Sequence, residues 1–404
     1  MKDMESYTSM MEKCSHCAFC EAVCPIFKED LLETHVARSR LLIIQEALIT
    51  KTLPLTRRVR EIVNRCLLCG QCRHACPGNV PVDDIVIAAR HAIYGDKRSG
   101  MIKRQMVRQM MALRGESTML KRALTLAHAS GVDMADYPNM AKTSFSKLYP
   151  PGTYAPRGPR RGRVAYFVGC ATNAFYPDTG DAVMQVMKEN NIEVVIPDQV
   201  ACCGMPALAD GDVDGAERLM RANIDALAAI QADAVITDCT SCLSVMKEKM
   251  AAVIDTSDPM RQAAEKVAAS MADAMVYLDT MGLKGDLPAL SQSYTLHVPC
   301  HAAGDEALTA AQLALLSYVD QARYLPLDDL SGCCGAGGTF FTRYKTVAAN
   351  IRKKKLDDIA HTQAALVVTG CPSCRTYIQA GLKGAKPVIH PMVLLARGYG
   401  FSLV

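Results

Sequence analysis

Short apolar runs alternate with stretches of helical spacing through the C-terminal two thirds of the chain. Residues 215–230 form the clearest helical stretch, with apolar side chains at Leu219, Ile224, Leu227 and Ile230. The runs expected as strands are 164–168, 194–196, 234–237, 294–298, 324–326 and 365–369. Because strands that alternate with helices form parallel sheets, we expect an α/β architecture after residue 164. The pattern repeats with a period of roughly 130 residues, taken from Cys170 to Cys300, which predicts an internal duplication.

The N-terminal part has helical spacing instead. Residues 41–48 fit one helix that begins after Arg40 and ends near Pro54, and residues 96–140 predict helical connectors. Prolines and glycines in 149–163 predict an irregular linker that its arginines keep solvated. The expected units are a helical module at 1–95, a connector and linker at 96–163, and two α/β domains at 164–285 and 286–404.

Charge and hydropathy exclude several classes of protein. The formal net charge of +4 over 404 residues is too small for a protein whose main partner is nucleic acid. The N-terminus has no apolar signal-peptide core. The longest apolar stretch, 41–49, is interrupted by Gln45 and Glu46, whereas a spanning helix needs about 20 apolar residues. We therefore expect a cytoplasmic protein without a transmembrane segment, with peripheral docking on the inner face of a membrane as the alternative.

Eighteen cysteines stand at metal-ligand spacings, which disfavours disulfides in a chain without an export signal. The first eight form two identical runs, Cys14-x2-Cys17-x2-Cys20-x3-Cys24-Pro25 and Cys66-x2-Cys69-x2-Cys72-x3-Cys76-Pro77. In this bacterial ferredoxin run the fourth cysteine ligates the other cluster. We therefore predict two cubane [4Fe-4S] clusters, the first held by Cys14, Cys17, Cys20 and Cys76, the second by Cys66, Cys69, Cys72 and Cys24. Zinc is the disfavoured alternative, since it rarely uses two such complete runs.

The other ten cysteines form two sets of five. The first set is Cys170, Cys202, Cys203, Cys239 and Cys242, and the second is Cys300, Cys333, Cys334, Cys371 and Cys374. Three loops of each set follow strands, and such loops converge at one edge of a parallel sheet. Glycine follows each Cys-Cys pair and permits a turn with positive φ. Five thiols exceed what a cubane or a tetrahedral zinc uses, so we expect a larger or open cluster, or one exchangeable thiol, with zinc as the alternative.

The repeated Cys-Cys-Gly pattern resembles the cysteine-rich CCG domains of heterodisulfide reductase. The spacer between the first two runs resembles the α-helical ferredoxin module of respiratory dehydrogenases. The whole chain resembles the iron–sulfur subunits of glycolate, lactate and anaerobic glycerol-3-phosphate dehydrogenases, and the fused catalytic subunit of membrane-linked heterodisulfide reductase. The resemblance implies an α-helical two-cluster ferredoxin module followed by two tandem α/β CCG domains. It also implies that one or both five-cysteine sets hold a noncubane [4Fe-4S] cluster.

The function that these expectations favour is electron relay in an oxidoreductase complex. No GxGxxG follows a strand, and no haem-attachment CxxCH occurs, so the flavin should lie on a partner subunit. That flavoprotein would oxidise a 2-hydroxyacid such as lactate or glycolate, and the clusters would pass single electrons to a quinone or another carrier. The alternatives are a reductase that cleaves a disulfide at a noncubane cluster, and a zinc-binding module. No catalytic residue is assigned.

Several polar residues near the motifs are expected to be ordinary. His297 and His301 flank Cys300, and His390 follows a strand-like run. We interpret each as a satisfied core or surface histidine, with hydrogen bonding to cluster sulfur or proton transfer as the alternative. The lysines 353–355 are expected to be a solvated helix face, with a docking patch for an acidic partner as the alternative.

Overall fold

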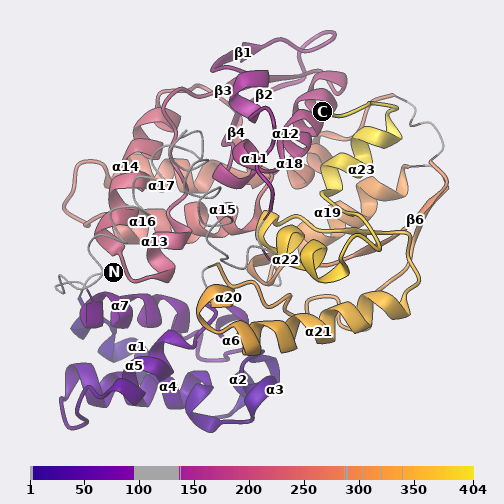
Figure 1. The fold of residues 1–404 in the computed structure, drawn as a ribbon. Coiled ribbons are helices and arrows are strands. Elements are labelled where there is room, and N and C mark those ends of the chain that lie inside the picture. The colour runs from indigo at the N-terminus through magenta and orange to yellow at the C-terminus, as the bar shows by residue number, and fades with distance from the viewer. Residues whose placement is uncertain are drawn as a thin grey trace.

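The computed structural model describes residues 3–94, 136, 138–285, 287, 290–302, 304–319, 321–338 and 340–404. Most of the expected connector at 96–140 lies outside these residues. Figure 1 shows a helical N-terminal module, in indigo and purple, beneath two domains that each contain a sheet. Among the described residues no helix combines the length and apolarity needed to cross a bilayer.

The N-terminal module consists of short helices without a strand between residues 3 and 94. They are η1 (Glu5–Tyr7), α1 (Thr8–Met11), α2 (Phe19–Val23), α3 (Phe27–Asp30), η2 (Glu33–His35), α4 (Ala37–Ile44), the π-helical η3 (Gln45–Ile49), α5 (Arg57–Asn64), α6 (Gln71–His74) and α7 (Val82–Tyr94). The helix expected to begin after Arg40 begins at Ala37 instead and ends at Ile49, before Pro54. Arg40 therefore lies inside this helix. Its guanidinium is buried and donates hydrogen bonds to the carbonyls of His35 and Ile62.

The first α/β domain has a five-stranded sheet in the order β1-β3-β2-β4-β5. Its strands are β1 (Gly152–Tyr154), β2 (Gly162–Tyr166), β3 (Ile192–Ile196), β4 (Ala234–Thr237) and β5 (Met271–Asp273). Its helices are α10 (Phe145–Leu148), α11 (Cys170–Ala174), α12 (Pro177–Glu189), α13 (Met205–Ala209), α14 (Val213–Ala228), α15 (Thr240–Ser244), the π-helical η4 (Val245–Lys249), α16 (Met250–Val253), α17 (Arg261–Ser270) and α18 (Ala274–Met281). The predicted strands of this domain are confirmed within two residues.

The expectation of an irregular linker is wrong at β1. Residues 152–154 pair antiparallel with 194–196 on β3, while the other strand pairs of the sheet are parallel. A strand at a sheet edge tolerates nearby proline and glycine, because only one of its sides must supply hydrogen bonds.

The second α/β domain has a four-stranded parallel sheet in the order β7-β6-β8-β9. Its strands are β6 (Gln292–Leu296), β7 (Ala322–Tyr324), β8 (Leu366–Val368) and β9 (Val388–Ile389). Its helices are η5 (Cys300–Ala302), α19 (Glu306–Ser317), α20 (Phe340–Arg343), α21 (Lys345–His361), α22 (Pro372–Leu382) and α23 (Pro391–Gly398). Since β6 pairs with β7 and β8 as β2 pairs with β3 and β4, the two domains repeat one arrangement.

One apolar core joins the two α/β domains. Helix α12 packs on α23 and α18 packs on α19, and a continuous buried cluster extends from Tyr166 to Leu296. At its border, the Arg375 guanidinium forms a 2.6 Å ion pair with Asp178 and stacks 4.1 Å from the centre of the Tyr176 ring. Burial of this shared apolar surface fixes the two cysteine sets relative to one another.

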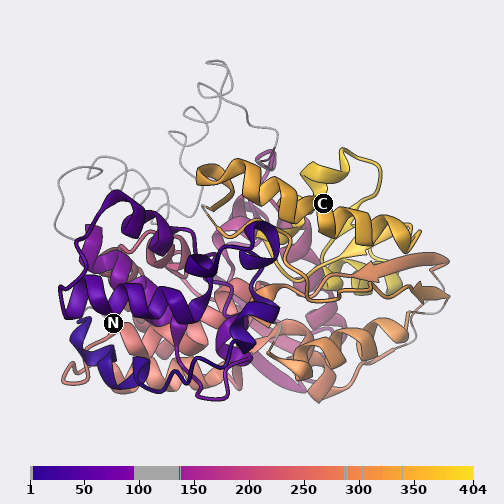
Figure 2. The same cartoon turned by 90° about the horizontal axis from the view of Figure 1, so that it is seen from below.

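The helical module contacts both α/β domains, as the view from below in Figure 2 also shows. Lys249 of η4 is buried and forms ion pairs with Asp83 and Asp84 at the start of α7. On the other side, the Gln71 amide donates to the Ser331 carbonyl at 3.1 Å. The module therefore lies directly under the loops that carry the two five-cysteine sets.

Candidate iron–sulfur sites

The two ferredoxin-type runs share one backbone conformation. Positive φ occurs two residues after the first cysteine of each run, at His16 (55°) and Leu68 (55°). It occurs again one residue after the second cysteine, at Ala18 (70°) and Gly70 (73°). Left-handed residues turn the chain sharply, and a short helix, α2 or α6, then carries the third cysteine. Both loops therefore curl in the way that three thiolates around one cluster require.

The fourth cysteine of each run lies with the opposite run. Burial and the thiolates of Cys66 and Cys24 raise the pKa of Cys72, which places these three sulfurs near one another. At the other end, a Cβ on Gly78 would lie 2.8 Å from the Lys13 carbonyl oxygen, so the end of the second run meets the start of the first. The two runs therefore meet at their ends, and the assignment of Cys24 and Cys76 to the opposite clusters stays a prediction.

Arg90 of α7 anchors the second run. Its guanidinium is buried and donates hydrogen bonds to the carbonyls of Val63, Asn64, Cys66 and Ala209. Burial lowers the pKa of Arg90 to about 10, so the group stays cationic at neutral pH. A buried positive charge at this loop favours an anionic group bound beside it.

All ten cysteines of the two five-cysteine sets line one cavity, which has a volume of about 120 Å³. Cys69 of the second ferredoxin-type run lines it as well. Strands β2, β4, β6 and β8 end directly before loops that deliver cysteines, as in other open α/β sheets. The glycines after the Cys-Cys pairs have the expected positive φ, 93° at Gly204 and 86° at Gly335.

The first set is gathered tightly. The sulfurs of Cys170 and Cys202 lie 3.8 Å apart. Hydrogen bonds from the thiols of Cys202 and Cys242 hold the pKa of Cys203 well below its usual range. The Cys239 sulfur accepts a 3.4 Å hydrogen bond from the Cys242 N–H. The structure therefore brings all five cysteines of the first set together.

The second set has the same arrangement. The sulfurs of Cys334 and Cys374 lie 3.2 Å apart. Hydrogen bonds from the thiols of Cys333 and Cys374 lower the pKa of Cys334 to about 5. The thiolate of Cys333 and burial raise the pKa of Cys300. Thiolates are the form that binds a metal, and the lowered pKa of Cys334 favours its thiolate.

The two sets meet at Cys239 and Cys371. Hydrogen bonds from the thiols of Cys239 and Cys374, of which the first has the larger effect, lower the pKa of Cys371 well below its usual range. Next to this contact, the Ser241 hydroxyl lies 3.4 Å from the Cys371 sulfur and 2.9 Å from Nδ1 of His301. His301 in turn places Nε2 3.0 Å from the Leu68 carbonyl oxygen in the second ferredoxin-type loop.

The second set also adjoins the second ferredoxin-type run. Burial raises the pKa of Cys69 well above its usual range, and the thiolates of Cys300, Cys72 and Cys333 raise it further. Cys69 is therefore close to two cysteines of the second set. Cys17 of the first run is exposed at the module surface, whereas Cys69 of the second run lines the shared cavity.

The sequence interpretation is wrong for two residues near the second set. Lys355 is buried rather than solvated, and its ammonium donates to the Asp329 carbonyl and to Asp358. His297 is buried, and neither ring nitrogen has a hydrogen-bond partner in the described part of the chain. Ser241 was missed altogether, although a serine precedes the final cysteine of both Cys-x2-Cys pairs, at 241 and 373.

The donor set fits iron–sulfur clusters. All eighteen cysteines lie in described segments, and each is a free thiol there. Sulfur-only sets select iron–sulfur clusters or zinc, and five thiols exceed the four ligands of a structural zinc site. The gathered thiols, the curled loops and the shared cavity define a class of iron–sulfur protein in which a two-run helical module serves two cysteine-rich α/β domains.

Comparisons with known proteins identify the same three parts. Residues 10–80 match the model of the 4Fe-4S dicluster domain, and residues 164–247 and 294–379 match that of the cysteine-rich domain called CCG. The chain therefore contains one dicluster domain and two CCG domains, and it is homologous to glycolate oxidase iron–sulfur subunits and lactate utilization proteins.

Three relatives illustrate this similarity. A probable glycolate oxidase iron–sulfur subunit of Bacillus subtilis is 25% identical, over 96% of this chain and 94% of the relative. One chain of the fumarate reductase (CoM/CoB) from Methanothermobacter marburgensis is 24% identical, over 97% of this chain and 73% of the relative. Lactate utilization protein A of an Exiguobacterium strain is 27% identical, over 52% of this chain and 86% of the relative.

Proposed function

We propose that this chain is the electron-relay subunit of a flavin-dependent 2-hydroxyacid dehydrogenase complex. The observation that carries the proposal is that Cys69 of the second ferredoxin-type run lines the same cavity as all ten cysteines of the two CCG domains. A flavoprotein partner would oxidise lactate or glycolate, and a quinone or another carrier would accept the electrons. The proposed setting is the cytoplasm, with docking on the inner face of the membrane as the alternative.

The proposed ligand sets follow the gathering of the thiols. Two cubane [4Fe-4S] clusters take the crossed runs of the module, and noncubane [4Fe-4S] clusters take the five-cysteine sets, with zinc as the alternative in a CCG site. The sets are Cys14, Cys17, Cys20 and Cys76; Cys66, Cys69, Cys72 and Cys24; Cys170, Cys202, Cys203, Cys239 and Cys242; and Cys300, Cys333, Cys334, Cys371 and Cys374.

Bound clusters supply one-electron redox chemistry, which the protein side chains cannot. The chain contributes spacing, exclusion of water and a suitable electrostatic environment. Arg90 holds the Cys66 carbonyl and places a cation beside the second run. Ser241 and His301 link the second ferredoxin-type loop to Cys371 and thereby hold the two α/β domains against the module.

The test is hydroxyacid-dependent reduction of the assembled complex. The tagged chain, purified without oxygen from its own organism, should bring down a flavoprotein, and lactate or glycolate should bleach the visible absorption of the clusters. Dithionite added to the isolated chain is the control for intact clusters. A complex whose clusters respond to dithionite but to neither hydroxyacid would contradict the proposal.

A disulfide reductase is the second candidate, because both five-cysteine sets open into one cavity lined mainly by apolar and sulfur atoms. The relative from the fumarate reductase (CoM/CoB) is similar over nearly the whole chain. The isolated, dithionite-reduced chain distinguishes the two functions. Re-oxidation by a small thiol disulfide without any partner would favour the reductase, whereas the relay predicts that the chain stays reduced.

A further inference from the structure

His297 and Phe167 occupy equivalent positions in the two CCG domains. Each follows an inner strand, β6 or β2, and stands three residues before the first cysteine of its set. The Phe167 N–H donates to the Ile236 carbonyl at 2.8 Å, and the His297 N–H donates to the Val368 carbonyl at 2.9 Å. Because the backbones are bonded alike, the two side chains enter their cysteine sets from corresponding points of the fold.

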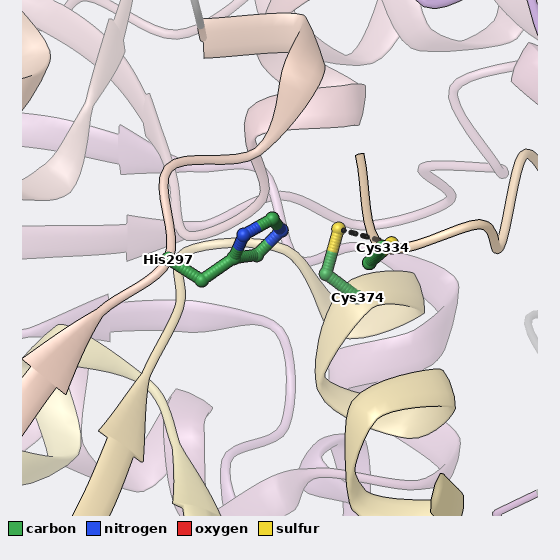
Figure 3. A group of neighbouring side chains, drawn as sticks. All are labelled: His297, Cys334 and Cys374. Atoms are coloured by element: carbon green, nitrogen blue, oxygen red, sulfur yellow. Dashed lines mark hydrogen bonds between the residues drawn. The ribbon is translucent and has the colours of Figure 1, made fainter. Parts of the chain in front are cut away.

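The two side chains offer different chemistry to their sets. Phe167 is fully buried in the apolar cluster that also contains Cys202, Cys203, Cys239 and Cys242. His297 is equally buried, and one of its ring nitrogens lies within 4.8 Å of the sulfurs of Cys334 and Cys374. Figure 3 shows the imidazole directed toward these sulfurs.

The imidazole of His297 is a hydrogen-bond donor, since at least one ring nitrogen carries a proton in either charge state. Neither nitrogen has a hydrogen-bond partner among the described residues. A buried polar group without a partner is rare in a native fold, and its position beside two thiols indicates a partner bound by those thiols.

We propose that His297 donates a hydrogen bond to sulfur of the cluster in the second five-cysteine set, and that this bond gives the second set a higher reduction potential than the first. The inference rests on the clusters of the proposed function. Reduction adds negative charge to a cluster, so an N–H···S bond stabilises the reduced form, and phenylalanine supplies no such bond. Electrons shared between the two CCG sites then reside mainly on the second site, the one beside Cys69.

The test replaces His297 with the residue of the first site. In His297→Phe, an anaerobic redox titration followed by EPR should show one midpoint potential lowered, with the others unchanged. The expected shift is tenfold in the ratio of reduced to oxidised cluster at fixed potential, about 59 mV for one electron. Iron and sulfide analysis of the same samples checks that the variant keeps its clusters.

Three further variants keep the test decisive. His297→Gln retains an N–H donor and should shift the potential less than His297→Phe. The reciprocal Phe167→His should raise a different midpoint potential. Tyr294→Phe changes a buried ring on the same strand, away from the cysteines, and should leave all potentials unchanged.

The outcomes separate this inference from the proposed function. Full iron content with unchanged potentials in both His297→Phe and Phe167→His would overturn the inference and leave the relay standing. Wild-type protein without iron in the second set would overturn the inference, and failure of hydroxyacid to reduce any cluster of the assembled complex would overturn the proposed function. If His297→Phe does not fold, pulsed EPR of the reduced wild-type protein decides. An exchangeable imidazole proton coupled to the cluster supports the hydrogen bond, and the absence of such a proton overturns the inference.

Discussion

Asp273 is a fully buried carboxyl at the end of β5, where Oδ1 accepts a hydrogen bond from the Met275 N–H and begins α18. Its other oxygen, Oδ2, has no partner among the described residues. Burial, together with the nearby carboxylates of Asp238 and Asp305, raises the pKa of Asp273 to about 7. The fold therefore prefers the protonated side chain.

This preference predicts a pH dependence of stability. Because the pKa of Asp273 is raised in the folded state, its protonated side chain contributes its full stabilisation of the fold below the unfolded pKa, about 3.9. This contribution to the free energy of unfolding is lost as pH rises through about 7. Asp273→Asn keeps the helix cap and removes the titration. Thermal unfolding of the cluster-loaded chain should show the variant gaining about 2–4 kcal/mol relative to wild type between pH 5 and pH 8. A difference that is constant across this range would contradict the assignment.

At the same scale, cysteines and their polar neighbours differ in how far the sequence predicts them. The spacing of the cysteines groups them into two sets whose ten thiols line one cavity, while the cluster each set holds stays a prediction. The burial of His297 and Lys355 depends on how α21 and β6 pack against distant segments, and no local pattern encodes that packing. Within the charge run 353–355, Lys355 forms an ion pair with Asp358. One helix face of the run is therefore buried while the other is solvated.

Among the secondary-structure elements, α7 and η4 join the helical module to the first CCG domain. The buried ammonium of Lys249 pairs with Asp83 and lies 2.7 Å from Asp84. Arg73 is farther away, 3.6 Å from Asp83 and 3.5 Å from Asp84. The buried carboxylate of Asp83 and the half-buried carboxylate of Asp84 therefore depend mainly on one cation.

Removal of that cation should loosen the junction. Lys249→Met leaves the two carboxylates underpaired, and loss of one partner of a buried ion pair costs about 3–5 kcal/mol. We expect a lower unfolding temperature and faster proteolytic release of residues 3–94. Lys247→Met, on the exposed side of the same η4 turn, is the matched control and should behave as wild type. Equal stability of the two variants would show that the ion pairs do not hold the module.

Elements were predictable where the chain carries a strong local pattern. Strand β4 was predicted to the residue, and α14 within two residues at each end, because an apolar run and a helical repeat mark them. Strands β1 and β5 were not predicted, since each is only three residues long and pairs with one neighbour at a sheet edge. Their positions follow from tertiary pairing rather than from local preference.

The whole molecule combines two duplications, two cysteine runs in the module and two CCG domains above it. The module reaches the CCG cavity through Cys69, which lies near Cys300 and Cys333 of the second set. The second set in turn contacts the first through Cys371 and Cys239. The sequence repeat predicts two similar CCG domains. It does not predict which of the two cysteine sets adjoins Cys69, because that depends on how the module packs against the two domains.

The most direct test of the account is the metal content of the intact chain. After anaerobic purification, iron, sulfide and zinc are measured on the same sample, with EPR of the reduced and oxidised forms. Four clusters of four irons predict about sixteen irons and as many sulfides per chain, with no zinc. About eight irons together with one or two zincs would show that only the helical module carries clusters, and would contradict the relay through the CCG cavity.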